Sequence, residues 1–265
     1  MNAISTTLSV ENVKIRASKI LPFGILACIF VSFMVGFLMF ISLHPELTNN
    51  SSIFTAKVAY FSETTWQSYF TLLLQMISAI GLILFGFLTT WMFGREYSDR
   101  TLKDLLALPI SRSATVISKF IIISIYSFVL SVVLFFCSIL VGAVLNISGW
   151  SYELFIRVSF VYFFTVLFAI LVTAPVALVA SIGKGYLGAF AFIVAVVMIS
   201  QFINLGLPGL DPYVPWAIPV IFSTTGLSND SSLPPLNIFS YIILIGTFVF
   251  GMIGTMYYWN YADQF

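Results

Sequence analysis

Long apolar runs separated by short polar segments dominate this chain. A helix that crosses a bilayer needs roughly 20 apolar residues, and six runs are of about that length. We predict spans at residues 20–42, 70–92, 118–145, 154–182, 186–204 and 236–259. The pattern therefore predicts an all-α integral membrane protein, with residues 1–265 forming a single transmembrane domain.

Helix breakers mark two points in the second half of the chain. Pro175 lies inside the fourth span, where it removes a backbone donor and crowds the preceding turn, so we predict a kink there. Only Gly183-Lys184-Gly185 joins the fourth and fifth spans, which predicts a tight helical hairpin.

The first 19 residues are polar overall but show a helical period. Apolar residues recur on one side and basic residues occupy the remaining surface: Val10, Val13, Ala17 and Ile20, then Lys14, Arg16 and Lys19. This pattern favours a short amphipathic helix on the lipid headgroups before the first span. A disordered basic tail is the alternative.

Residues 205–235, between the last two spans, are rich in Gly and Pro and contain one apolar piece, 214–222, that is too short to cross. A re-entrant element that dips into the membrane and a long surface loop both fit this pattern.

Basic residues in short loops set the orientation of the spans. With the N-terminus cytoplasmic, nine of the 11 Lys and Arg residues fall on that side, and only Lys57 and Arg157 fall on the other. We therefore predict that both termini are cytoplasmic and that residues 205–235 are extracellular.

The composition excludes several classes of function. A net charge of +1 leaves no basic excess for nucleic acid. The chain has no phosphate-binding Gly-x-x-x-x-Gly-Lys-Ser/Thr, no His-Glu-x-x-His and no pair of Asp residues within the spans. We expect a non-catalytic chain that itself holds no metal or cofactor.

Ionisable residues are rare in the predicted spans. Glu153 and Arg157 lie one turn apart at the outer end of the fourth span, where we expect them to pair. The absence of a buried carboxylate argues against an ion-coupled carrier. Neutral polar side chains most often serve helix packing. The candidates for a substrate path are Gln75, Thr89, Ser127, Ser131 and Gln201.

The segment 93–119 holds eight of the 21 charged residues and is predicted to be a water-facing loop. Thr101-Leu102-Lys103-Asp104 fits a capping box, and Pro109 ends the short helix that begins there. Leucines 102, 105 and 106 share one face. That face is suited to a groove on a soluble partner, or to resting on the bilayer.

Phe93-x-x-Glu96, followed by Thr101-Leu102-x-x-Leu105-Leu106-x-x-Pro109-Ile110-Ser111-Arg112, resembles the signature of ABC-2 type permeases, the membrane subunits of ATP-binding-cassette exporters. The layout of the whole chain is similar to the lantibiotic-immunity and bacitracin-export type, although only the loop is specific. Arg100 departs from the pattern, because many members have Gly before the Thr.

The resemblance implies a bacterial plasma-membrane permease that exports an amphiphilic peptide or antibiotic-like cargo. It implies two separate ATPase subunits that bind ATP and Mg, and a second permease, identical or homologous. The implied coupling residues are Glu96, Arg100, Thr101, Leu102, Leu105, Leu106, Pro109 and Arg112, with Lys119 anchoring the return into the third span. A secondary carrier or channel and a non-transporting membrane partner are the alternatives.

Overall fold

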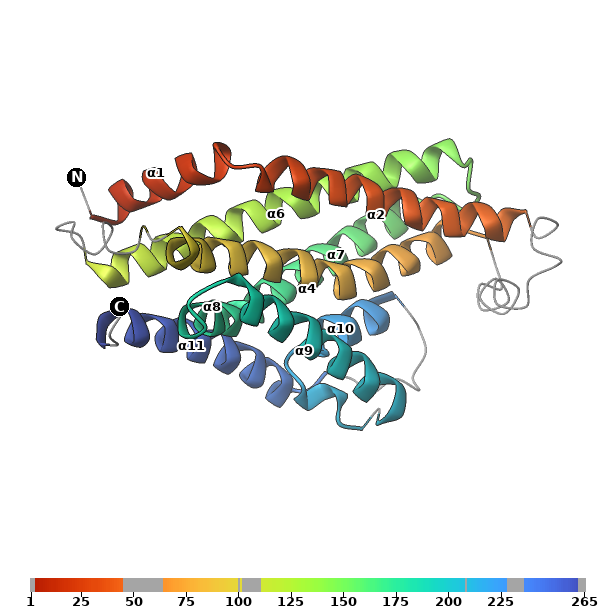
Figure 1. The fold of residues 1–265 in the computed structure, drawn as a ribbon. Helices are drawn as coiled ribbons and strands as arrows, with labels where there is room; N and C mark the ends of the chain where they lie inside the picture. The colour runs from red at the N-terminus through yellow and green to blue at the C-terminus, as the bar shows by residue number, and fades with distance from the viewer. Residues whose placement is uncertain are drawn as a thin grey trace.

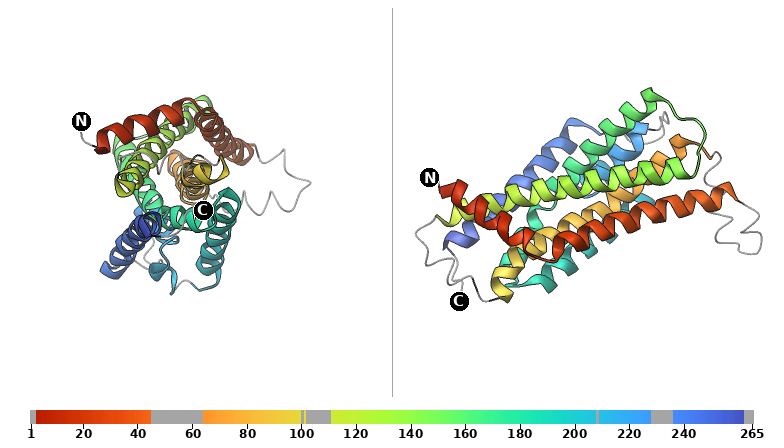
Figure 2. Two further views of the ribbon diagram at one scale, coloured as in Figure 1. Left: turned by 60° about the vertical axis from the view of Figure 1, so that its left-hand side comes forward. Right: turned by 90° about the horizontal axis from the view of Figure 1, so that it is seen from above.

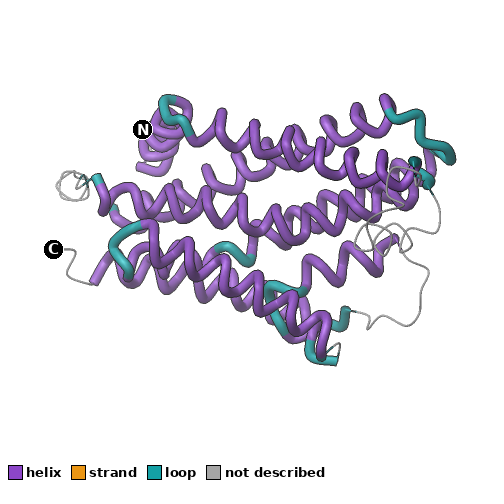
Figure 3. The backbone as a smooth tube through the Cα atoms, turned by 45° about the vertical axis from the view of Figure 1, so that its right-hand side comes forward, coloured by secondary structure: helices purple, strands orange, loops and turns teal. Residues whose placement is uncertain are grey.

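The computed structural model describes residues 3–44, 64–99, 101, 111–207, 209–227 and 236–261. Nearly all of these residues lie in helices, and the connections that are described are short (Figure 3). Six helical stretches are long and apolar enough to cross a membrane: Ile20–Leu43, Trp66–Ser98, Arg112–Val144, Tyr152–Ile182, Tyr186–Ile203 and Ile238–Tyr261. The prediction of an all-α protein with six spans is confirmed.

The elements follow one another as α1 (Ala3–Arg16), α2 (Ile20–Leu43), α4 (Trp66–Ser98), α6 (Arg112–Val144), α7 (Tyr152–Leu171), α8 (Ala174–Ile182), α9 (Tyr186–Gly206), the 3-10 turn η2 (Asp211–Tyr213), α10 (Ile218–Leu227) and α11 (Ile238–Tyr261). Several begin at residues that cap a helix well. Thr65, Ser111 and Ser151 each accept a hydrogen bond from the backbone N–H three residues further on.

Helix α4 lies at the centre of the bundle, and Figure 2 shows the other helices arranged around it. It packs against α2, α6, α7, α8, α9 and α10. Its central position explains why its span is more buried than those of α9 and α11, which are mostly exposed. The exposed side chains of these outer helices are large and apolar, as lipid contact requires.

The described ends of the chain, at α1 and α11, lie at the same end of the bundle (Figure 1). That end also holds the end of α4, the start of α6 and the turn between α8 and α9. We call it the basic end, because it contains most of the described basic residues: Lys14, Arg16, Lys19, Arg95, Arg112, Lys119 and Lys184.

The fourth span is broken as predicted. Helix α7 ends at Leu171 and α8 begins at Ala174, with Pro175 in its first turn. The N–H of Val176 bonds to the carbonyl of Thr173 at 3.0 Å rather than to that of Val172. The Val172 carbonyl is therefore left without its helical donor, and Trp216 Nε1 donates to it at 3.1 Å.

Helix α11 packs against this break, and a glycine makes the approach possible. A Cβ atom on Gly251 would lie 2.4 Å from the backbone carbon of Ala174 and 2.5 Å from the nitrogen of Pro175. No side chain fits such a gap against fixed backbone. The break in span four thus provides a seat for the last helix.

The hairpin at residues 183–185 is also confirmed. Helix α8 ends at Ile182 and α9 begins at Tyr186. Lys184 adopts the left-handed conformation with φ of 47°, which a residue between two helices needs if the chain is to reverse within three positions.

The apolar piece at 214–222 lies within the bundle rather than over its surface. Helix α10 packs against α7 and α4. It begins close to Trp216, which reaches the break in span four, and its last turn lies at the opposite end of α7, where Arg157 Nε donates to the Gly226 carbonyl at 3.1 Å. Both alternatives for residues 205–235, a re-entrant element and a surface loop, stay predictions. The expected pairing of Glu153 with Arg157 is wrong: these two described residues form no ion pair, and Arg157 donates to Gly226 instead.

The N-terminal helix forms, and it also packs on α6, a contact that the sequence did not predict. The face on α6 consists of Thr7, Glu11 and Ile15, all buried. Val10 and Val13 are 46% and 65% exposed, so these apolar residues face away from the bundle. Hydropathy alone does not distinguish a protein-facing side from a lipid-facing one.

The segment 93–119 is not a loop throughout. Helix α4 continues to Ser98 and α6 begins at Arg112, so helix occupies residues 93–98 and 112–119 of this segment. Glu96 and Lys119, which we expected to face water, are buried. Residues 100 and 102–110 lie outside the described residues.

Candidate functional site

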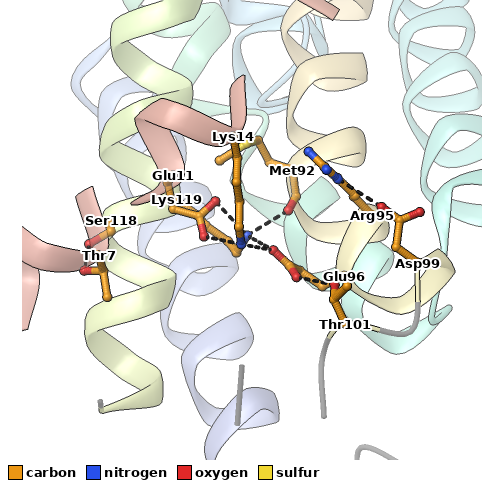
Figure 4. Close-up of polar contacts among 10 residues, drawn as sticks. All are labelled: Thr7, Glu11, Lys14, Met92, Arg95, Glu96, Asp99, Thr101, Ser118 and Lys119. Carbon is orange, nitrogen blue, oxygen red and sulfur yellow. Dashed lines mark hydrogen bonds and ion pairs between the residues drawn. The ribbon is translucent and has the colours of Figure 1, made fainter. Parts of the chain in front are cut away.

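A buried cluster of two carboxylates and two ammonium groups joins three helices at the basic end (Figure 4). Lys119 Nζ of α6 lies 2.9 Å from Glu96 Oε1 of α4 and 3.1 Å from Glu11 Oε2 of α1. Lys14 Nζ, also on α1, lies 2.8 Å from the same Glu96 oxygen and 3.1 Å from Glu11 Oε1. The four charges therefore form a closed ring of ion pairs.

Lys119 is the most enclosed member. Its third donor goes to the Met92 carbonyl at 3.1 Å, so all three ammonium protons are used. Its Nζ also lies 5.9 Å from the centre of the Phe93 ring. The side chain is 1% exposed. A buried charge requires such complete pairing, since desolvation is otherwise very costly.

Lys14 lies at the rim of the cluster, with its side chain 27% exposed. Burial lowers the pKa of this amine, but the attraction of Glu11 and Glu96 and their hydrogen bonds outweigh burial, so that its pKa is raised. Lys14 therefore stays charged at neutral pH, and the cluster has two positive and two negative charges.

Further polar contacts hold α1 on α6. Toward the N-terminal ends of α1 and α6, Thr7 Oγ1 and Ser118 Oγ share a hydrogen bond. Further along both helices, Tyr126 OH donates to Asn12 Oδ1 at 2.7 Å and accepts from Arg16 Nε at 3.3 Å. Helix α1 is thus attached to α6 along most of its length.

Described residues anchor both ends of the candidate coupling segment, residues 102–110. At the first end, Thr101 Oγ1 donates to Glu96 Oε2 at 2.9 Å. At the second, Arg112 Nη1 donates to the carbonyl of Trp259 at 3.0 Å, where a cation also complements the C-terminal end of α11. Asn260 Nδ2 adds a bond of 2.9 Å to Ser113 Oγ.

The same end of α4 touches the hairpin between α8 and α9. A Cβ on Gly94 would lie 2.9 Å from Tyr186 Cδ1 and 3.0 Å from the backbone of Gly185. Nearby, Trp259 is 1% exposed and its Nε1 donates to Ser181 Oγ at 2.9 Å. All described helices of the basic end therefore meet around the end of α4.

Two comparisons with known proteins bear on this arrangement. The family model described as "ABC-2 family transporter protein" matches residues 7–201, which include every member of the ion cluster. The bacitracin transport permease protein BCRB of Bacillus licheniformis is 28% identical over 191 residues, which are 72% of this chain and 88% of the relative.

The chain belongs to the ABC-2 transporter family. It is a multi-pass membrane protein and a permease subunit of a transporter. The family works in assemblies with an ATPase. The matched region ends before α10 and α11, so these two helices lie beyond it.

The structure places the predicted coupling residues of this permease in two groups. Glu96, Thr101 and Arg112 are described, and all three make the anchoring contacts given above. The remaining five lie outside the described residues: Arg100, Leu102, Leu105, Leu106 and Pro109. The predicted helix from residue 102 and its apolar face therefore stay predictions.

The candidates for a substrate path are spread over three helices of the permease. Thr89 and Ser131 are buried, and their hydroxyls donate to carbonyls of their own helices at 2.9 and 2.7 Å. Ser127 is buried, and its hydroxyl has no hydrogen-bond partner among the described residues. Gln75 and Gln201 are half-buried. The first two hydroxyls serve their own helices.

Sequence reasoning missed Glu11, the partner of Lys119 from α1. It also expected no buried carboxylate in the spans, whereas Glu96, near the end of the second span helix, is 3% exposed. The available signal was that Glu11 is the only acidic residue in a basic N-terminal segment and stands three positions before Lys14. Among the described residues, no three His, Cys, Asp or Glu side chains gather as a metal site requires.

Proposed function

We propose that this ABC-2 permease is the membrane half of an exporter, and that its separate ATPase subunits dock on residues 102–110. The observation that carries the proposal is the buried ring of ion pairs, because two of its members, Glu96 on α4 and Lys119 on α6, flank that segment in the chain. A segment anchored in this way passes a displacement to α4, α6 and α1 together. No chemical step is required of this chain.

The energetic argument is one of linkage. ATP-driven closure of the ATPase subunits favours one membrane conformation only if they bind that conformation more tightly than the other. Lys119 connects the three helices through fully used donors, so these helices move as a unit rather than one by one. The ion cluster is therefore the proposed transmitter between the docking segment and the spans.

Each coupling residue has a proposed role. Leucines 102, 105 and 106 fill a groove on the ATPase, in a helix that Thr101 caps and Pro109 ends. Arg100 supplies charge beside that helix. Glu96 anchors the segment on α4, and Arg112 anchors it on α11.

The proposed assembly has two permeases and two ATPases. The ATPases bind ATP and Mg, and the second permease is identical or homologous to this chain. The basic end faces the cytoplasm of a bacterial cell, with both termini inside, in agreement with the excess of Lys and Arg there. The assembly lies in the plasma membrane.

The proposed cargo is an amphiphilic peptide or antibiotic-like molecule that leaves the cell or the membrane. The similarity to a bacitracin transport permease supports this class of cargo. Export, rather than uptake, is part of the same proposal.

The test is co-purification of the ATPase encoded with this permease. Replacing Leu105 and Leu106 together by Asp should release the ATPase while the permease still inserts in the membrane. The matched control is Val13→Asp, which puts a carboxylate on an exposed apolar position of the same end and should leave binding unchanged. Stoichiometric recovery of the ATPase with the double variant would show that it docks elsewhere.

A further inference from the structure

A groove of about 720 Å³ runs between α1 and α6 on the outer surface of the bundle, beside the ion cluster but separate from it. The wall from α1 carries the polar side chains Ser9, Asn12 and Arg16 beside Leu8. The wall from α6 is apolar apart from the Tyr126 hydroxyl, with Ile121, Ile125 and Val129. Such a volume is within the range of about 300–1,000 Å³ that is common for small-molecule sites.

The polar wall presents a cation at a fixed position. Asn12 and Arg16 are four residues apart and share one side of α1. Tyr126 OH accepts from Arg16 Nε and donates to Asn12, which orients both side chains. Within the described part of the chain, no carboxylate lies within ion-pair distance of Arg16, in contrast to Lys14 and Lys119.

The apolar wall faces lipid. Ile121, Ile125 and Val129 recur every four residues on a membrane-spanning helix and are 38%, 49% and 43% exposed. Arg16 ends α1, and the first span begins four residues later at Ile20. The cation therefore lies where the hydrocarbon gives way to headgroups, with the apolar wall continuing below it.

We propose that this groove binds one anionic phospholipid, with its phosphate on Arg16 and Asn12 and an acyl chain along Ile125 and Val129. The guanidinium retains its two NH₂ groups for phosphate oxygens, which it binds in a two-pronged geometry. Lys19, which is exposed and follows Arg16 by three residues, adds a second positive charge. A headgroup with a net negative charge is preferred, because the quaternary ammonium of a choline headgroup would be repelled by the positive charges of Arg16 and Lys19.

Native mass spectrometry of the purified permease tests this proposal, with phosphatidylglycerol and phosphatidylcholine of identical acyl chains added in turn. Phosphatidylglycerol should bind the wild type more tightly. Arg16→Gln should weaken that binding roughly ten- to hundredfold, as expected for lost hydrogen bonds to a charged group. Arg95→Gln is the matched control, since Arg95 is half-buried at the same end but pairs with Asp99, and it should bind like the wild type.

Ile125→Trp keeps the charge and fills the groove from its exposed wall, so it should also reduce lipid binding. It decides the question if Arg16→Gln fails to fold. Equal phosphatidylglycerol binding by wild type, Arg16→Gln and Ile125→Trp would overturn the proposal. Binding of glycerol phosphate as tight as that of the lipid would also overturn it, because the groove would then be a simple anion site.

Discussion

Removal of Lys119 tests the buried-charge reasoning most directly. Lys119→Met keeps the length and apolar stem of the side chain but leaves Glu11 and Glu96 with only the partly exposed Lys14. Breaking a buried ion pair by removing one partner costs about 3–5 kcal/mol. We expect the lower part of that range, about 3 kcal/mol, because Lys14 still pairs with both carboxylates.

Two further variants set the scale. Arg95→Ala removes an ion pair whose side chains are 35% and 46% exposed, and such pairs contribute about 0–1 kcal/mol. Adding Glu11→Gln to Lys119→Met restores charge balance, with Lys14 and Glu96 still 2.8 Å apart. The double variant should therefore be more stable than the sum of the two single losses, by about 1 kcal/mol or more.

The measurement is reversible unfolding of the purified permease in mixed micelles, titrated with a denaturing detergent. A loss for Lys119→Met no larger than that for Arg95→Ala would refute the claim that the cluster is a desolvated, mutually dependent ring. So would a double variant whose loss equals the sum of the single losses.

Two other predictions concern the break in span four. Gly251→Ala should destabilise the fold by about 1–3 kcal/mol, because its Cβ meets the backbone of Ala174. Gly246→Ala, on the same helix but with no atom within 4 Å of its Cβ, should leave the stability unchanged. The detergent titration described above compares the two variants. Trp216→Phe should cost about 1–3 kcal/mol by leaving the Val172 carbonyl unsatisfied, and a cost under about 0.5 kcal/mol would mean that another donor replaces the indole.

The secondary structure was predictable because its signals are local. Six apolar runs, Pro175 and the hairpin at 183–185 each act through neighbouring residues, and the structure confirms all three. The contact of α1 with α6 was not predictable from hydropathy, because the face that makes it is polar. Thr7 and Glu11 pack on α6, whereas Val10 and Val13, which set the sequence pattern, stay exposed.

The candidate site was predictable only in part. Glu96, Thr101 and Arg112 stand out in the loop pattern. The partner of Lys119 does not, since Glu11 is 108 positions away and a single sequence gives no sign that the two meet. Lys119 itself was assigned to a water-facing loop because the segment 93–119 holds eight charged residues between two apolar runs. Its ion pairs with Glu11 on α1 and Glu96 on α4 let the ammonium group lie buried instead.

The ring of charges also has a consequence for biogenesis. Each half of it is neutral by itself: Glu11 and Lys14 are three positions apart on one helix, and Glu96 and Lys119 pair across the α4–α6 hairpin. The hairpin can therefore enter the bilayer before α1 has docked, without an uncompensated charge on either side. Docking of α1 then joins two neutral pairs, so the first helix is free to be the last part of the basic end to assemble.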